Sequence, residues 1–71
     1  MKDRNGRTYA KLSDCRLGTK LEADGGFTCL LKGSIVTIRF DSGFPYFECI
    51  SGRHYLSGQV DGEYLIGLYL A

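Results

Sequence analysis

The sequence lacks the long apolar run that a membrane-spanning segment would need. Such a segment takes roughly 18 or more consecutive apolar residues, and no stretch of the 71-residue chain approaches that length. The first residues, Met-Lys-Asp-Arg-Asn-Gly, lead into no apolar segment of the kind found in secretory signals. We therefore expect a cytoplasmic protein with no membrane partner.

Histidine and cysteine are scarce, which restricts metal and redox chemistry. The chain has one histidine, His54, and three cysteines, Cys15, Cys29 and Cys49. The cysteines lie far apart along the chain, whereas zinc sites normally use closely spaced pairs. Three thiols cannot all pair within one chain, so we expect free cysteines in a reducing compartment. The sequence thus predicts no metal and no cofactor, and it leaves open whether these four side chains converge on a metal.

Recognisable catalytic and phosphate-binding motifs are also missing. His54 follows Gly52 and Arg53 at a predicted hairpin tip, and a general base there would need a nucleophile and an orienting partner that the sequence does not identify. The glycines fit neither the P-loop nor the dinucleotide-binding pattern. We therefore predict a non-enzymatic protein without catalytic residues. A small oligomeric enzyme with a site shared between subunits is kept as an alternative, because a single sequence does not reveal such a site.

Charge is balanced overall but unevenly placed. Nine basic and eight acidic residues give a net charge of +1. Residues 1–20 hold six of the basic and two of the acidic residues, so this part carries +4, whereas the remainder carries −3. Residues 1–7 show no hydrophobic period and contain Asn5-Gly6, so we predict a flexible basic N-terminal arm. Residues 8–71 then form one small domain.

What the chain does contain is a pattern of short strands and glycine turns. Residues 27–41 are the longest apolar and β-branched run, and Val36, Ile38 and Phe40 alternate with polar residues as in a half-buried strand. We expect this run to form the sheet core. Asp-Gly and Gly-Gly pairs favour tight hairpins, which predicts residues 19–24 beside residues 27–32. A turn at Lys-Gly-Ser would then place residues 27–32 beside the strand that follows.

The second half of the chain predicts further antiparallel strands. Phe44 precedes a proline, which favours an extended conformation at Phe44, and we expect a loop to follow. Residues 46–50 and 54–59 flank Ser-Gly-Arg and should form a hairpin. After an Asp-Gly turn, residues 63–71 are apolar on both faces of a predicted strand. These patterns predict an all-β fold of five to six short antiparallel strands.

Residues 30–38, Leu-Leu-Lys-Gly-Ser-Ile-Val-Thr-Ile, resemble the strand entry of bacterial SH3-like small β-barrels. In those families a Lys-Gly-Asp or similar turn precedes a Val-x-Val strand, and here Ser34 stands where an acidic residue is more usual. The resemblance implies a small SH3-like barrel. It also implies binding of peptides, nucleic acids or other subunits more often than catalysis, and it assigns no role to any single residue.

One group of side chains combines aromatic and basic character near the predicted 46–59 hairpin. Such residues can anchor a protein partner or stack on nucleic-acid bases. A protein partner is favoured, because the chain lacks the basic excess of most nucleic-acid-binding domains. In the nucleic-acid alternative, Arg4 and Arg7 of the arm would join the contact. The predicted binding residues are Arg39, Tyr46, Arg53, His54 and Tyr55.

The C-terminal strand is the second candidate contact. A strand that is apolar on both faces must be covered twice, and a 71-residue chain has little material to cover it. We therefore predict a homo-oligomer whose interface includes Tyr64, Ile66, Leu68 and Tyr69. The small size of the chain also suits an accessory protein of a phage or another mobile element.

Overall fold

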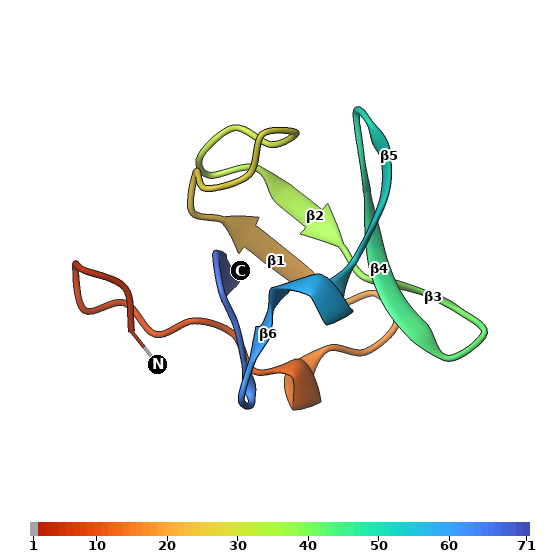
Figure 1. The fold of residues 1–71 in the computed structure, drawn as a ribbon, viewed down its shortest axis with the longest axis horizontal. Helices are drawn as coiled ribbons and strands as arrows, with labels where there is room; N and C mark the ends of the chain where they lie inside the picture. The colour runs from red at the N-terminus through yellow and green to blue at the C-terminus, as the bar shows by residue number, and fades with distance from the viewer. Residues whose placement is uncertain (1) are drawn as a thin grey trace.

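The computed structural model describes residues 2–71, which form short strands and two 3-10 helices around one core (Figure 1). The prediction of an all-β fold is confirmed. The strands of the described residues form three antiparallel sheets, in the orders β2-β1-β8, β3-β4-β5 and β6-β7, and do not close into one barrel. The elements are η1 (Leu12–Asp14), β1 (Lys20–Ala23), β2 (Ile35–Thr37), β3 (Arg39–Asp41), β4 (Phe44–Cys49), β5 (Gly52–Tyr55), η2 (Leu56–Gln59), β6 (Val60–Asp61), β7 (Tyr64–Leu65) and β8 (Leu68–Leu70).

Strand β1 lies at the centre of the first sheet. Its sequence alternates, so that Leu21 and Ala23 are fully buried while Lys20 and Glu22 lie on the outer face. β1 pairs antiparallel with β2 on one side and with β8 on the other. The pairing brings the C-terminal end of the chain beside residues near position 20.

The predicted hairpin of residues 19–24 with residues 27–32 is wrong. Residues 24–34 form a loop, and the partner of β1 is β2. The apolar side chains of this loop, Phe27 and Leu30, pack against the core without joining a sheet. The Asp24 carboxylate accepts a hydrogen bond from the Gly26 N–H at 2.7 Å, which turns the backbone away from β1. The apolar run therefore supplies core side chains but no neighbouring strand.

The strand predicted from alternation over residues 35–41 is divided between two sheets. Ile38 lies between β2 and β3 and is fully buried, and its N–H donates to the Thr19 carbonyl at 2.8 Å. This bond ties the crossing point to the segment before β1. The chain then leaves the first sheet and enters the second, so Val36 lies in the core whereas Phe40 is partly exposed.

The second sheet is built from two consecutive hairpins. Ser42 and Gly43 both have positive φ angles, 52° and 86°, as a two-residue hairpin turn requires. The loop predicted after Phe44 is wrong, because Phe44 begins β4. Pro45 is tolerated there, since β5 pairs with β4 only from Tyr46 onward and the missing N–H is not needed. The predicted hairpin around residues 51–53 is confirmed, although its second arm ends at Tyr55, where η2 begins.

The apolar segment of residues 63–71 is two strands rather than one. The turn at Asp61-Gly62-Glu63 is confirmed, with β6 and β7 as its arms. Gly67 then breaks the segment with a φ of 91°, and β8 joins the sheet of β1. A Cβ at this position would lie 3.0 Å from Cε2 of Phe27, so the break requires glycine on both conformational and steric grounds.

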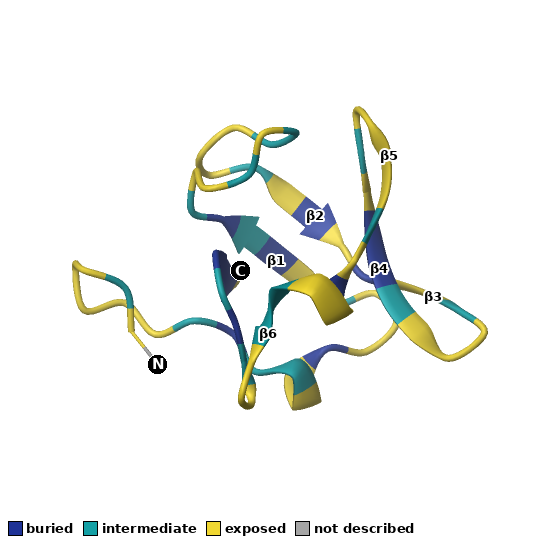
Figure 2. Cartoon of the chain, viewed as in Figure 1, coloured by how far each residue is buried: buried dark blue, intermediate teal, exposed yellow. Residues whose placement is uncertain are grey.

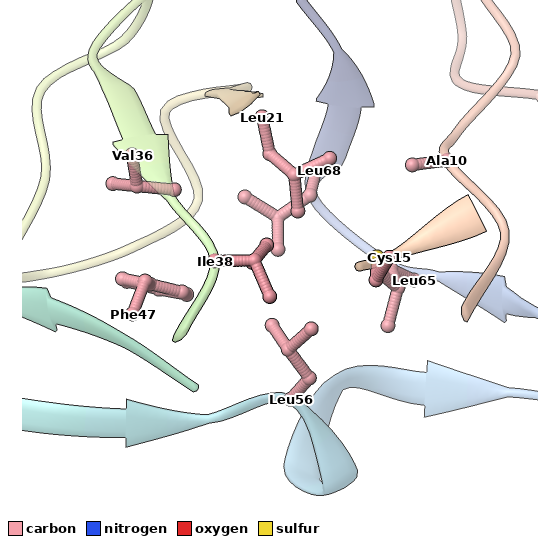
Figure 3. Packing of buried hydrophobic residues seen from close by; sticks show 9 residues of the cluster. All are labelled: Ala10, Cys15, Leu21, Val36, Ile38, Phe47, Leu56, Leu65 and Leu68. Carbon is pink, nitrogen blue, oxygen red and sulfur yellow. The ribbon is translucent and has the colours of Figure 1, made fainter. Parts of the chain in front are cut away.

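The core lies where the sheets meet, and Figure 3 shows its side chains converging from all of them. Residues 8–11 run past β7 and β8: the Ala10 N–H donates to the Leu68 carbonyl, and the Ala10 carbonyl accepts from the Leu65 N–H, both at 2.8 Å. This segment is therefore hydrogen-bonded to both strands but forms only isolated bridges. Figure 2 shows buried residues in β1, β2 and β4 and mostly exposed ones along β5 and the loops. No helix within residues 2–71 has the length and apolar character to cross a bilayer.

Candidate functional site

The outer face of the β3-β4-β5 sheet gathers most of the predicted binding residues. The register places Arg39 opposite Tyr46, and Tyr46 opposite Tyr55, so these three side chains share one face. Asp41 and Phe44 are paired on the same face, and so are Glu48 and Arg53. We call this surface the aromatic face; its residues are Arg39, Asp41, Phe44, Tyr46, Glu48, Arg53 and Tyr55.

Asp41 organises the aromatic face. One oxygen of its carboxylate, Oδ2, accepts hydrogen bonds from Arg53 Nη1 at 3.0 Å and from the Tyr55 hydroxyl at 2.9 Å. The Arg53 guanidinium lies 4.6 Å from the centre of the Tyr46 ring, within cation–π distance. The Tyr46 and Tyr55 rings are tilted against each other with centroids 5.4 Å apart. Four side chains are thus held in one arrangement by mutual contacts.

Exposure differs sharply across the aromatic face. Tyr46 is only 6% exposed, because neighbouring side chains cover its ring. Phe44 is 63% exposed and Tyr55 is 37% exposed. The ring of Tyr46, a predicted binding residue, is therefore covered. The accessible apolar surface lies at Phe44, which the sequence placed just before a predicted loop.

His54 is the one predicted binding residue on the opposite face of this sheet. Its ring stacks on Phe47, with centroids 5.0 Å apart, and meets the edge of Phe27 at 5.3 Å. Its Nε2 lies 3.3 Å from Oε1 of Gln59. The imidazole is half-buried in these contacts, so His54 packs on the core side and does not join the other four predicted residues.

A second polar cluster surrounds a cavity of about 540 Å³ between the N-terminal segment and the β2-β1-β8 sheet. This volume is within the range of small-molecule sites, although the lining is mostly polar. We call it the N-terminal cavity. Its wall contains three acidic and three basic side chains. The acidic ones are Asp3, Glu22 and Asp24, and the basic ones are Arg4, Arg7 and Lys32.

Tyr69 of β8 is the centre of this second cluster. The Arg7 guanidinium lies 3.9 Å from the centre of the Tyr69 ring, and the Tyr9 ring stacks on it with centroids 5.2 Å apart. Arg7 also donates two hydrogen bonds to the carboxylate of Glu22, at 3.0 and 3.1 Å. This bidentate bond lowers the pKa of Glu22. Tyr69 is consequently only 6% exposed, although it lies on the outer face of its sheet.

Asp3 connects the N-terminal segment to Tyr69. The Tyr69 hydroxyl donates a hydrogen bond to the Asp3 carboxylate, which raises the pKa of Tyr69 to about 12 and lowers the pKa of Asp3. The other Asp3 oxygen accepts from the backbone N–H groups of Asn5 and Arg7, both at 2.9 Å. Residues 2–7 thus form a turn with defined contacts. Met1 lies outside the described residues, and the flexibility predicted for the arm stays a prediction.

The predicted subunit interface is covered largely by the chain itself. Leu68 is fully buried in the core, and Tyr69 is covered by Arg7 and Tyr9. Tyr64 and Ile66 are half-buried, and the Lys11 ammonium lies 5.6 Å from the Tyr64 ring. A second subunit was expected because both apolar faces of this segment need cover. Residues 2–71 themselves provide much of that cover.

The cysteines and His54 do not form a shared metal site. Within the part of the chain that the structure describes, no three side chains of histidine, cysteine, aspartate or glutamate come together in a way that could hold a metal ion. Cys15 is buried, its Sγ lies 3.6 Å from the Lys11 carbonyl oxygen, and burial raises the pKa of its thiol. Cys29 and Cys49 are half-buried in another part of the molecule.

Sequence reasoning missed the N-terminal cavity because its parts are far apart along the chain. Asp3 and Tyr69 are 66 residues apart, and Arg7 and Glu22 are 15 apart. The one local signal was the outward position of Glu22 on an alternating strand. Comparison with protein-family models, with curated proteins and with solved structures gives no match for this chain.

Proposed function

We propose that this chain is a non-enzymatic binding module that docks a protein partner through the aromatic face. The observation that carries the proposal is the exposed ring of Phe44 beside a fixed group of Tyr46, Tyr55 and Arg53. Tyrosine and arginine are enriched among the residues that dominate binding energy at protein interfaces. An exposed apolar ring next to such a group offers a partner both contact area and directed hydrogen bonds.

Pre-organisation supports the same surface. Asp41 holds Arg53 and Tyr55 before any partner arrives. Ordering a flexible side chain at an interface costs about 0.5–1.5 kcal/mol, so side chains that are already fixed lose less on binding. Arg39 is exposed at the edge of this group, where it can donate to a carboxylate or carbonyl oxygen of the partner.

Charge argues for a protein rather than a nucleic acid as the partner. Arg7 and Arg53 are each bound to a carboxylate of the same chain, so two of the cations expected to contact phosphates are already engaged. Nucleic-acid binding remains the alternative proposal, and salt separates the two, because affinity carried by phosphate contacts falls steeply as the salt concentration rises.

The finer predictions belong to the same proposal. An SH3-like module is what the resemblance of residues 30–38 implies. A cytoplasmic location and an accessory role in a phage or another mobile element follow from the composition and size of the chain. Association with a second copy is a special case of protein docking, in which the partner supplies the same aromatic face.

The test is affinity capture with the immobilised full chain. Wild type, Phe44→Ser and a control, Leu17→Ser, are compared at low and at high salt after nuclease treatment. Leu17 is 77% exposed and lies outside the aromatic face, so its substitution changes exposed apolar area without touching the proposed surface. We expect a protein retained at high salt by wild type and Leu17→Ser and lost by Phe44→Ser.

Two results would contradict the proposal. Equal capture by all three proteins would place the contact elsewhere, and capture that disappears with nuclease or salt would favour the nucleic-acid alternative. Light scattering on the same three proteins identifies self-association: a dimer that Phe44→Ser dissociates and Leu17→Ser preserves would make the partner a second copy of this chain.

A further inference from the structure

Every carboxylate oxygen in the wall of the N-terminal cavity already accepts a hydrogen bond from the chain itself. Glu22 receives one bond at each oxygen from Arg7, at 3.0 and 3.1 Å. Asp24 accepts from the Tyr9 hydroxyl at 3.2 Å and, at its other oxygen, from a backbone N–H at 2.7 Å. Asp3 accepts at one oxygen from a side-chain hydroxyl and at the other from two backbone N–H groups. The acidic side chains of the wall are therefore engaged within the chain.

Two cations of the same wall are in the opposite condition. Arg4 lies in the N-terminal turn and Lys32 in the 24–34 loop, and both are exposed. The ion pairs within residues 2–71 join other side chains, so neither cation is paired with a carboxylate there. Arginine carries five N–H donors and lysine carries three. The wall therefore has unused hydrogen-bonding capacity of donor type and positive charge, which suits an anionic ligand.

Backbone contacts hold Lys32 at the edge of the cavity. A Cβ on Gly25, whose φ is 96°, would lie 3.2 Å from the Cβ of Lys32, so the lysine stem lies directly over the glycine. The next residue, Gly33, donates its N–H to the Ala23 carbonyl at 2.8 Å, and the Ala23 N–H donates to the Ser34 carbonyl at 2.9 Å. The loop is thereby joined to the end of β1 immediately after Lys32.

Arg4 is held in a turn that closes on itself. The Asp3 N–H donates to the Arg7 carbonyl at 2.9 Å, and the Gly6 N–H donates to the Asp3 carbonyl at 3.1 Å. Both bonds span Arg4. The two unpaired cations therefore reach one cavity from separate segments, and each segment has a backbone that is fixed by hydrogen bonds.

We propose that the N-terminal cavity binds a small organic phosphate monoester, whose phosphate group is held between Arg4 and Lys32. This inference goes beyond the proposed docking function and does not depend on it. The cavity lies against the β2-β1-β8 sheet, whereas the aromatic face belongs to the β3-β4-β5 sheet.

Charge, geometry and size select this class of ligand. A phosphate monoester carries roughly −1.5 to −2 charges near neutral pH and presents three acceptor oxygens. One phosphate group can therefore accept from a guanidinium and from an ammonium at once, whereas a carboxylate offers two oxygens. The cavity volume of about 540 Å³ exceeds the space of a single inorganic anion, so an organic body fits beside the phosphate. The Tyr9 ring and the polar lining are available to contact that body.

The experiment titrates the full chain by calorimetry with ribose phosphate, ribose, inorganic phosphate and malate at one ionic strength. We expect saturable binding of ribose phosphate and no measurable binding of ribose, which lacks the anionic group. Inorganic phosphate should bind more weakly, because it lacks the organic body. Malate, which carries its charge on two separate carboxylates, should also bind more weakly than ribose phosphate.

The variants test the two cations against a control of equal charge change. Arg4→Ala and Lys32→Ala should each weaken the binding of ribose phosphate by about tenfold, as expected for the loss of a hydrogen bond between charged groups. Arg16→Ala also removes one positive charge, but Arg16 does not line the cavity, so this variant should bind like wild type. Phe44→Ser should also bind like wild type, which keeps this result separate from the docking proposal.

A second measurement uses the wild-type chain alone. Ribose phosphate should slow trypsin cleavage after Arg4, because the phosphate would join the N-terminal turn to the 24–34 loop, and ribose should leave the cleavage rate unchanged. The inference is overturned if ribose phosphate binds no better than ribose or malate. It is equally overturned if Arg16→Ala weakens binding as much as Lys32→Ala does, since the attraction would then depend on net charge and not on the cavity.

Discussion

In the aromatic face, Arg53 lies over Tyr46 and binds Asp41, and in the N-terminal cavity, Arg7 lies over Tyr69 and binds Glu22. Each cluster also contains a second tyrosine against the first. The chemistry is nearly the same, yet the aromatic face is built by residues 39–55 through consecutive hairpins. The N-terminal cavity joins segments from both ends of the chain.

The two assemblies leave different surfaces. Hairpin register places the side chains of the aromatic face in rows, so its outer members remain open to solvent and Phe44 projects beside them. At the N-terminal cavity, residues 3–9 lie across the sheet and cover Tyr69. The comparison teaches that the same tyrosine–arginine–carboxylate group lies at a solvent-open sheet face in one place and holds the N-terminal segment against a sheet in the other.

The largest expected difference between the clusters follows removal of the central rings. Tyr69→Ala should lower the Tm by roughly 15 °C or more, as for other buried aromatic truncations, and should also release residues 2–9. Tyr46→Ala should destabilise the protein without releasing residues 2–9, because Tyr46 lies in a different sheet from Tyr69. The neighbours of Tyr46 are held by hairpin pairing. Thermal unfolding and limited trypsin cleavage after Arg4 and Arg7 measure the two effects. Equally rapid trypsin cleavage of Tyr69→Ala and Tyr46→Ala would contradict the prediction that only Tyr69 holds residues 2–9.

A smaller difference is expected from the two arginines. Arg7 makes two hydrogen bonds to Glu22 and lies 3.9 Å from its ring, whereas Arg53 makes one bond to Asp41 and lies 4.6 Å from its ring. Arg7→Ala should therefore lower the Tm by about 5 °C and Arg53→Ala by about half as much. Both losses are small because both ion pairs are solvent-exposed. Calorimetry on both variants checks the order. A larger decrease in Tm for Arg53→Ala would contradict this order and mean that Arg53 stabilises the protein more than Arg7 does.

The smallest effect is an alkaline loss of stability specific to the N-terminal cavity. The folded-state pKa of Tyr69, about 12, lies above its ordinary value of 10. The hydrogen bond to Asp3 therefore contributes its full stability below pH 10, and this contribution is lost as the pH rises to about 12. The difference in unfolding free energy between wild type and Tyr69→Phe should shrink over this interval. A constant difference would contradict the assigned bond, and Tyr55→Phe provides the matched control at the aromatic face.

Local patterns predicted one of the two clusters but not the other. The hairpin around residues 51–53 was predictable because glycine and β-branched or aromatic residues act over short range, and its register then placed Tyr46 against Tyr55. Alternation along β5 places His54 on the face opposite Arg53 and Tyr55, where Phe27 of the 24–34 loop packs on its ring. The contact with Phe27 is tertiary, whereas the cover over Tyr46 comes from Arg53 within the hairpin.

The sequence by itself determined the all-β class, the turns around residues 51–53 and 61–63, and four residues of the aromatic face, Arg39, Tyr46, Arg53 and Tyr55. These features depend on φ preferences and on alternation within a few residues. Tertiary structure alone decided that residues 27–32 form a loop, that Gly67 divides the last apolar segment, and that Arg7 and Tyr9 cover Tyr69. In each case segments that are distant in the chain compete to cover the same apolar surface. Local propensity does not predict which segment does so.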